Sequence, residues 1–155
     1  MIIINQKWQL VLILTLTEAL TPFKALVGIR NAGEIYDHLV RQKPLSEMIG
    51  HDLLFKLKEG KETADTIKKI VAKLISLNEQ KLSKLFEQLL ACKTNPLHDL
   101  FSKLNEQHHH DIGCLFIYFM NFIELNPGQA IFIGPNVPHA YLKGGIINYI
   151  SFRCD

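Results

Sequence analysis

The change in apolar periodicity near residue 108 constrains the fold more than any other feature of this sequence. Between Thr63 and Leu104, apolar side chains recur three and four positions apart, a spacing that places them on one face of a helix. Beyond residue 108 they come in short runs rich in aromatic and β-branched residues, which is typical of strands. These runs are residues 114–125, 129–133 and 146–152. The pattern predicts an α+β fold in which helices are followed by about three strands.

Candidate cap residues divide the helical region. Thr63, Asn78 and Asn95 each precede an apolar stripe, where a short polar side chain can accept a hydrogen bond from the first helical turn. Pro96 follows Asn95, and proline suits the first helical position because its missing N–H is not needed there. An earlier helix is predicted over residues 33–42. The stripes should pack against one another and form a core rather than a ligand site.

The predicted strands are separated by turn residues, notably Asn126-Pro127-Gly128 and Gly134-Pro135. Three strands alone have open edges and an uncovered apolar face. We therefore expect the carboxy-terminal third to be aggregation-prone outside a larger sheet. The helical part, residues 20–107, is expected to fold by itself.

Composition excludes some function classes. Lys and Arg number 17 against 15 Asp and Glu, and the lysines are scattered, so neither nucleic-acid nor membrane-surface binding is predicted. The three cysteines, Cys92, Cys114 and Cys154, form no CxxC pair. They are expected to be reduced thiols in a cytosolic protein, with Cys92 and Cys114 buried and without a partner that would make them nucleophiles.

The apolar run at residues 10–16 follows Lys7 and imitates a short signal peptide. Isoleucines precede the lysine, no small-x-small cleavage site follows, and the run is shorter than the ~20 residues that span a bilayer. A buried strand or helix is the main interpretation. A targeting segment, in a secreted or membrane-anchored protein, is the alternative.

His139 is the best single candidate for site chemistry. Tyr141 follows two residues later, so both side chains would point the same way in an extended segment. Spacing alone does not define a zinc site, which needs three or four ligands. The triplet at residues 108–110 is interpreted as a polar linker, because adjacent residues in a loop rarely converge on one ion. His38, His51 and His98 fall at polar helix or loop positions.

Several blocks of the chain resemble type I phosphomannose isomerases: residues 20–30 (LTPFKALVGIR), 111–119, 125–132, and 136–144 (NVPHAYLKG). The resemblance covers about residues 19–147. It implies a cupin (jelly-roll) β-barrel interrupted by a helical insertion domain. The expected division is a divergent apolar segment at 1–18, the helical insertion domain at 19–110, and partial cupin strands at 111–155.

The implied activity is the zinc-dependent interconversion of mannose 6-phosphate and fructose 6-phosphate in the cytoplasm, which feeds GDP-mannose synthesis. In that family a Gln, two His and a Glu hold the zinc ion. His139 is similar to the second of those histidines, and Tyr141 matches the tyrosine that lines the substrate pocket. A Lewis-acid metal would stabilise an enediol-like species while a general base moves the proton.

This sequence also departs from the family pattern. No counterpart of the Gln-x-His pair is present, Thr15 falls where the ligand Glu is expected, and Asn148 falls where a substrate-site Glu is expected. The family's catalytic arginine would come after Asp155. We therefore predict no catalytic residues here, and zinc not held by this chain alone. The abrupt departures before residue 19 and after about 147 suggest a partial gene, an unusual splice form or a mispredicted reading frame.

Two functions follow as hypotheses. The first is an isomerase-family polypeptide, truncated and inactive alone, whose small-molecule partner is a sugar phosphate. The alternative is a non-catalytic helical and cupin module that binds a ligand or another protein. The sequence does not indicate an oligomeric state.

Overall fold

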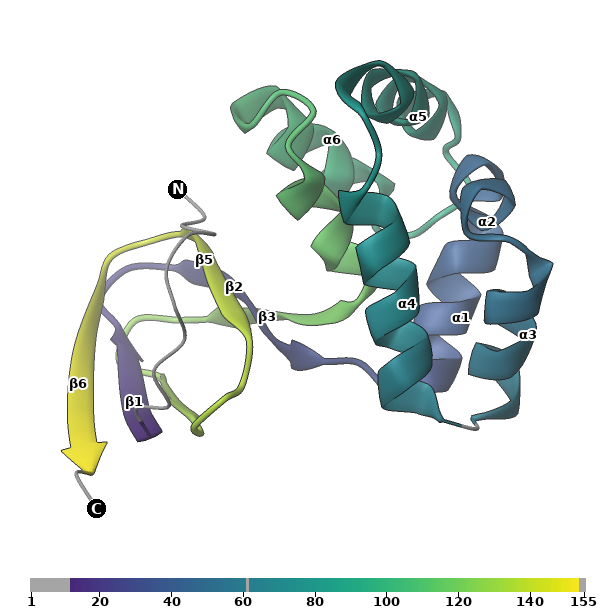
Figure 1. Cartoon of the computed structure of the whole chain (residues 1–155). Helices are drawn as coiled ribbons and strands as arrows, with labels where there is room; N and C mark the ends of the chain where they lie inside the picture. Colours follow the sequence, from purple (N-terminus) through teal and green to yellow (C-terminus); the bar gives the residue numbers. More distant parts are fainter. Residues whose placement is uncertain (1–11, 61, 154–155) are drawn as a thin grey trace. The chain divides into compact units, whose positions relative to one another are not determined.

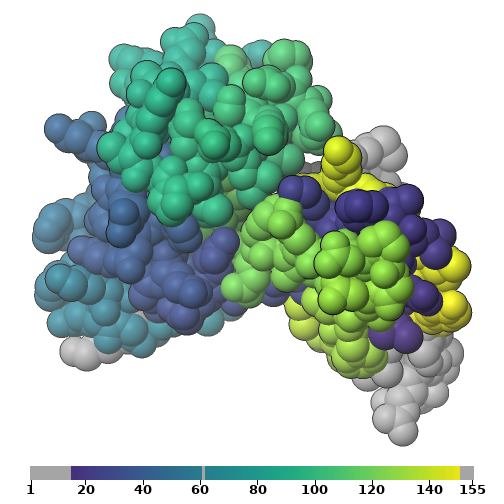
Figure 2. All heavy atoms as spheres, turned by 180° about the vertical axis from the view of Figure 1, so that it is seen from behind, coloured from purple at the N-terminus to yellow at the C-terminus, as the bar shows by residue number. Residues whose placement is uncertain are grey.

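The computed structural model describes residues 12–60 and 62–153, and it divides into two compact units (Figure 1). The helical unit is Arg30–Phe119. The strand unit combines the residues before Arg30 with those after Phe119, so purple and yellow segments from the two ends of the sequence form one surface in Figure 2. These boundaries differ from the expected ones because residues 23–29 form a strand and residues 112–118 pack against helices.

The helical unit contains six α-helices and a 3₁₀ helix, η1, among its described residues. Their bounds are α1 Ala32–Arg41, α2 Lys43–Ile49, α3 His51–Glu59, α4 Thr63–Ile75, α5 Glu79–Ala91, α6 His98–Gln107 and η1 Ile112–Tyr118. No helix within residues 12–60 and 62–153 is long and apolar enough to cross a membrane.

Asn78 caps α5 as predicted, since its side chain accepts a hydrogen bond from the Lys81 N–H. The prediction for Thr63 was wrong: Glu62 is the N-cap of α4, and the Thr63 hydroxyl donates to the carbonyl of Gly60. Asn95 is not the N-cap of α6 either, because that helix begins at His98. Its side chain instead accepts from the N–H of Leu97 in the preceding turn.

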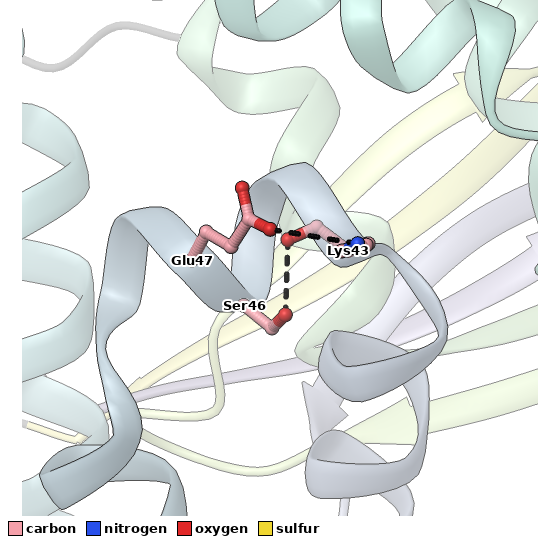
Figure 3. Close-up of polar contacts among 3 residues, drawn as sticks. All are labelled: Lys43, Ser46 and Glu47. Atoms are coloured by element: carbon pink, nitrogen blue, oxygen red, sulfur yellow. Dashed lines mark hydrogen bonds and ion pairs between the residues drawn. The ribbon is translucent and has the colours of Figure 1, made fainter.

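At the start of α2, the Ser46 hydroxyl donates to the carbonyl oxygen of Lys43 at 2.9 Å, and the Lys43 ammonium lies 4.0 Å from the Glu47 carboxylate (Figure 3). Both charged side chains are exposed. An exposed ion pair of this kind contributes only ~0.3–0.5 kcal/mol. These contacts therefore support the helix locally and do not define a site.

The core of the helical unit comes from the predicted stripes. Ile70, Phe86, Leu89 and Phe101 are fully buried, and the rings of Phe86 and Phe101 have centroids 5.3 Å apart. Each such side chain contributes roughly 1.5–3 kcal/mol when removed from water. The interpretation of the stripes as core is confirmed.

The strand unit holds two three-stranded antiparallel sheets. In the first, β1 (Leu12–Ala19) lies between β4 (Ala130–Ile133) and β6 (Ile146–Arg153). In the second, β2 (Phe23–Ile29) lies between β3 (Met120–Leu125) and β5 (His139–Lys143). The α+β class is confirmed, and the described strands do not close into a barrel.

Two strand predictions need correction. Six strands, rather than three, occur among the described residues, because the segments at 12–19, 23–29 and 139–143 also pair. Cys114 does not open a strand: residues 112–118 form η1, which begins where the Asp111 side chain accepts from the N–H of Gly113 at 2.6 Å. The described part of the apolar run at 10–16 is a strand, and residues 1–11 of the predicted amino-terminal segment lie outside the described residues.

The alternation of β1 gives its sheet two different faces. Thr15, Thr17 and Ala19 are buried on one face. Ala19 packs with Phe23 and Ala25 of strand β2 in an apolar cluster. Leu16 lies on the opposite face, where it pairs with Phe132 and Tyr149. The exposed large apolar side chains of this outer face are Leu16, Phe132, Ile147 and Tyr149. Glu18 lies on the same face, opposite Ile147.

Candidate functional site

The strand β5 presents His139 and Tyr141 on one face, as the alternation of an extended segment predicted. Their ring centroids are 5.5 Å apart, and both side chains are exposed. The His139 Nδ1 atom lies 3.0 Å from the carbonyl oxygen of Val137. Because a carbonyl only accepts, Nδ1 is the donor in this hydrogen bond, which leaves Nε2 as the ring nitrogen that the bond does not use. His139 can therefore bind a ligand or a metal ion through Nε2.

The Tyr141 hydroxyl joins a polar network built from three strands. It lies 3.0 Å from Thr17 Oγ1 and 3.5 Å from Asn148 Oδ1, and Thr17 Oγ1 donates to Asn148 Oδ1 at 2.8 Å. The ring of Phe23 meets Tyr141 edge-on, with centroids 5.3 Å apart. The apolar cluster thus supports the tyrosine ring, while its hydroxyl takes part in the network.

Sequence reasoning did not identify Thr17, and it singled out Asn148 only as a departure from a family pattern. The contact between them is set by register, since Thr17 stands opposite Asn148 in the pairing of β1 with β6. These residues are 131 positions apart. No local sequence signal marks such a pair.

The residues described do not form a zinc site. Within residues 12–60 and 62–153, no group of three or more His, Cys, Asp or Glu side chains is placed to hold a metal ion. Thr15, at the position where a ligand Glu was expected, is buried and pairs with Ile133 and Ile150. A hydroxyl there cannot replace a carboxylate ligand, and one imidazole does not define a tetrahedral site.

The histidine triplet at residues 108–110 follows α6. The ring of His110 lies against Phe86, with centroids 5.3 Å apart. The backbone N–H of His110 donates to Oδ1 of Asn105. His108 is the C-cap residue of α6. The contacts of these two residues are thus structural ones within the helical unit.

A shallow groove of about 500 Å³ lies in the helical unit. Its lining includes His38, Arg41 and Asn95, together with acidic and basic side chains. Burial lowers the pKa of His38, and the guanidinium groups of Arg30 and Arg41 act in the same direction. Asn95 is buried, but it is already bonded to the His38 carbonyl and ring. The groove therefore offers side chains of mixed charge, and its buried polar side chain, Asn95, already has its partners within the helical unit.

The two described cysteines, Cys92 and Cys114, differ in burial. Burial raises the pKa of the Cys114 thiol to about 11, and the nearby Asp111 carboxylate adds to the shift, so the thiol is protonated at neutral pH. Cys92 is only partly buried, contrary to expectation, and its sulfur contacts the Thr94 hydroxyl and the Arg41 carbonyl. Cys154 lies outside the described residues.

The fold and the site together define a class: an α+β chain in which a helical unit interrupts an open pair of antiparallel sheets, with a His-x-Tyr face on one sheet edge. No family model matches the chain. It is similar to mannose-6-phosphate isomerases from Macaca fascicularis, mouse and human, with 35%, 34% and 33% identity. Each match includes 86% of this chain, so the predicted resemblance is confirmed.

The chain spans about a third (35%) of the length of these curated relatives. Among solved structures, it is similar in fold to a phosphomannose isomerase from Salmonella typhimurium and to a mannose 6-phosphate isomerase bound with zinc and yttrium. In both cases the TM-score is 0.73, the identity is 23%, and the match covers 90% of this chain and 35% of the other.

Proposed function

We propose that this chain is a mannose-6-phosphate isomerase polypeptide that carries part of the sugar-binding face and is inactive by itself. The observation that carries this proposal is the combination of the His139–Tyr141 face with the network to Thr17 and Asn148. The similarity to mannose-6-phosphate isomerases supports the choice of mannose 6-phosphate and fructose 6-phosphate as ligands.

The proposed inactivity follows from what the isomerisation requires. Moving a proton between adjacent sugar carbons needs a general base and a group that stabilises the developing negative charge on oxygen. His139 and Tyr141 can orient a sugar by hydrogen bonds. No carboxylate is hydrogen-bonded to them among the described residues, and the donor set does not fit zinc. The described face therefore binds a sugar without transforming it.

In the same proposal, zinc belongs to the complete isomerase site, His139 is one of its ligands, and the product enters GDP-mannose synthesis. The proposed location is the cytoplasm, since the cysteines lack disulfide-type spacing and reduced thiols are usual there.

The test is a titration with mannose 6-phosphate, followed by NMR of the labelled protein, together with a coupled isomerase assay and a zinc determination. Tyr141→Phe and His139→Ala should each weaken binding about 2–10-fold, the effect of one net hydrogen bond. Tyr149→Phe is the control, because Tyr149 is exposed on the outer face. Turnover with stoichiometric zinc would show that the assigned ligands are wrong.

The alternative, a non-catalytic interaction module, is favoured by one observation: the exposed apolar outer face of the β4-β1-β6 sheet. Surfaces of this kind are commonly covered by other polypeptide. Under this alternative, Tyr149→Phe would change the binding of another polypeptide to this face, whereas Tyr141→Phe would not.

A further inference from the structure

We propose that Thr17 is a positioning residue, which orients Tyr141 and Asn148 so that they bind neutral hydroxyl groups of a sugar and not its phosphate. This inference rests on the proposed function, because it names the part of the ligand that this face takes. The inference adds Thr17 to the proposed site as a buried residue whose own side chain does not contact the ligand.

The hydrogen-bond directions follow from the number of protons available. Thr17 is 0% exposed and donates its only hydroxyl proton to Asn148 Oδ1 at 2.8 Å. Its Oγ1 atom, 3.0 Å from the Tyr141 hydroxyl, can then only accept. The proton of Tyr141 therefore points inward, to Thr17 or to the more distant Asn148 Oδ1 at 3.5 Å.

This arrangement decides what the exposed side of the network offers. Tyr141 is 39% exposed, and with its proton directed inward it presents an oxygen lone pair. Asn148 is also exposed, and because its Oδ1 already accepts from Thr17, its Nδ2 group presents two N–H donors. The exposed side of the network therefore presents one acceptor, the Tyr141 oxygen, beside two donors, the N–H groups of Asn148 Nδ2.

A sugar hydroxyl matches this set, since it can donate to Tyr141 and accept from Asn148. A phosphate dianion offers acceptor oxygens only, so it would meet the lone pair of Tyr141 with repulsion. No lysine or arginine side chain hydrogen-bonds to the network within the described residues, so no charge-assisted hydrogen bond of the network favours a phosphate.

Thr17 fixes the donor and acceptor directions of Tyr141 and Asn148, and it does so from a rigid position in the sheet. It lies on the central strand of its sheet, paired with Ile131 on β4 and with Asn148 on β6. Valine has the same shape and suits a strand equally well, but it would remove the inward acceptor and donor together. The Asn148 amide could then rotate, and the Tyr141 proton could turn outward. Serine would keep the hydroxyl and restore the polarity.

The test uses the full chain, labelled with ¹⁵N and with ¹³C tyrosine, and titrated separately with mannose, mannose 6-phosphate and inorganic phosphate. Mannose and mannose 6-phosphate should shift the Asn148 side-chain amide and the Tyr141 ring signals, whereas inorganic phosphate should leave them unchanged. Thr17→Val should weaken mannose binding about tenfold, and Thr17→Ser should restore it to within twofold. Thr15→Val is the matched control, buried on the same face of β1 but outside the network.

Thermal unfolding of each variant shows whether it is folded, and the Tyr141 ¹³Cζ shift reports the orientation of its proton independently of ligand. The inference alone fails if mannose 6-phosphate binds but Thr17→Val and Thr15→Val bind mannose equally well, or if phosphate shifts the Asn148 amide and mannose does not. If the wild-type chain binds neither mannose nor mannose 6-phosphate, the proposed function fails together with it.

Discussion

The backbone N–H of Arg30 donates to the carbonyl oxygen of Phe119 at 2.9 Å, and this bond joins the two ends of the helical unit. A segment whose ends are adjacent can be inserted into, or removed from, another domain with little disturbance. The helical unit also has its own buried core. These features make it a candidate for independent folding.

We expect residues 30–119, expressed alone, to be soluble and to unfold in one cooperative transition. The expected result is a helical circular dichroism spectrum with a sigmoidal loss on addition of urea, as for a small two-state domain. A gradual, non-cooperative loss of signal would show that the unit needs the strands to fold.

Leu57 and Phe55 provide a matched pair on one helix, α3, because Leu57 is 0% exposed and Phe55 is 51% exposed. Leu57→Ala should lower the free energy of unfolding by about 2–5 kcal/mol, since it removes buried methyl groups and leaves a cavity. Phe55→Ala should change it by about 0.5 kcal/mol or less. Urea titrations of both variants check this, and equal effects would contradict the burial of Leu57 and the exposure of Phe55 on α3.

Gly144, between β5 and β6, is required by both backbone conformation and space. Its φ is +109°, and a Cβ atom there would lie 2.7 Å from the carbonyl oxygen of Pro22 and 2.8 Å from the Cα atom of Phe23. Gly144→Ala should therefore cost at least about 1–3 kcal/mol. Gly128, with a φ of +83° and open space around it, is the control, and its Ala variant should cost only about 1 kcal/mol.

The thermal stabilities of the two glycine variants are compared by following the amide NMR signals of the strands during heating. The additional cost at Gly144 comes from backbone atoms, which cannot move aside as a flexible side chain can. If Gly144→Ala were no more destabilising than Gly128→Ala, this result would contradict the close approach of Gly144 to the Pro22 carbonyl oxygen.

Phe132 is 61% exposed on the outer face of the β4-β1-β6 sheet and pairs with Leu16. We predict that Phe132→Thr reduces aggregation, because it interrupts the apolar face while keeping a residue that suits a strand. Light scattering during concentration of the protein measures this. Leu20→Thr, at an exposed position outside the paired strands, is the control and should have little effect.

Local patterns predicted the features that local physics decides. The apolar stripes gave the helical core, Asn78 was a cap as expected, and the alternation of His139 and Tyr141 placed them on one face. The aromatic run at residues 114–118 was misjudged as strand, because the Asp111 side chain begins a 3₁₀ turn there. That local signal was present in the sequence, but the apolar composition outweighed it.

The network around Thr17 could not be predicted in this way. Thr17 lies on β1 and its partners lie on β5 and β6, and its contact with Tyr141 joins residues 124 positions apart in the chain. Such a contact depends on which strands pair and in which register, and a shift of one residue would turn Thr17 to the opposite face. Neither composition nor spacing within a segment contains this information.

Cys114 makes stability depend on pH in the alkaline range. Burial raises the pKa of its thiol to about 11 in the folded chain, whereas an exposed thiol has a pKa of about 8.5. Folding therefore favours the protonated form. The resulting stability is fully present below about pH 8.5 and is lost as the pH rises toward 11, because the unfolded chain releases this proton first. Burial also raises the pKa of Tyr118 above its usual value, which extends the loss to higher pH.

The measurement is the urea midpoint of the full chain between pH 8 and pH 10.5, for the wild type and for Cys114→Ala. The wild-type midpoint should fall more steeply with pH, although the variant starts from a lower stability because it loses a buried side chain. Alkylation with iodoacetamide at pH 8, located by peptide mass, should be slow at Cys114 and faster at the partly exposed Cys92. Parallel pH profiles together with equal alkylation rates would contradict the burial of the Cys114 thiol.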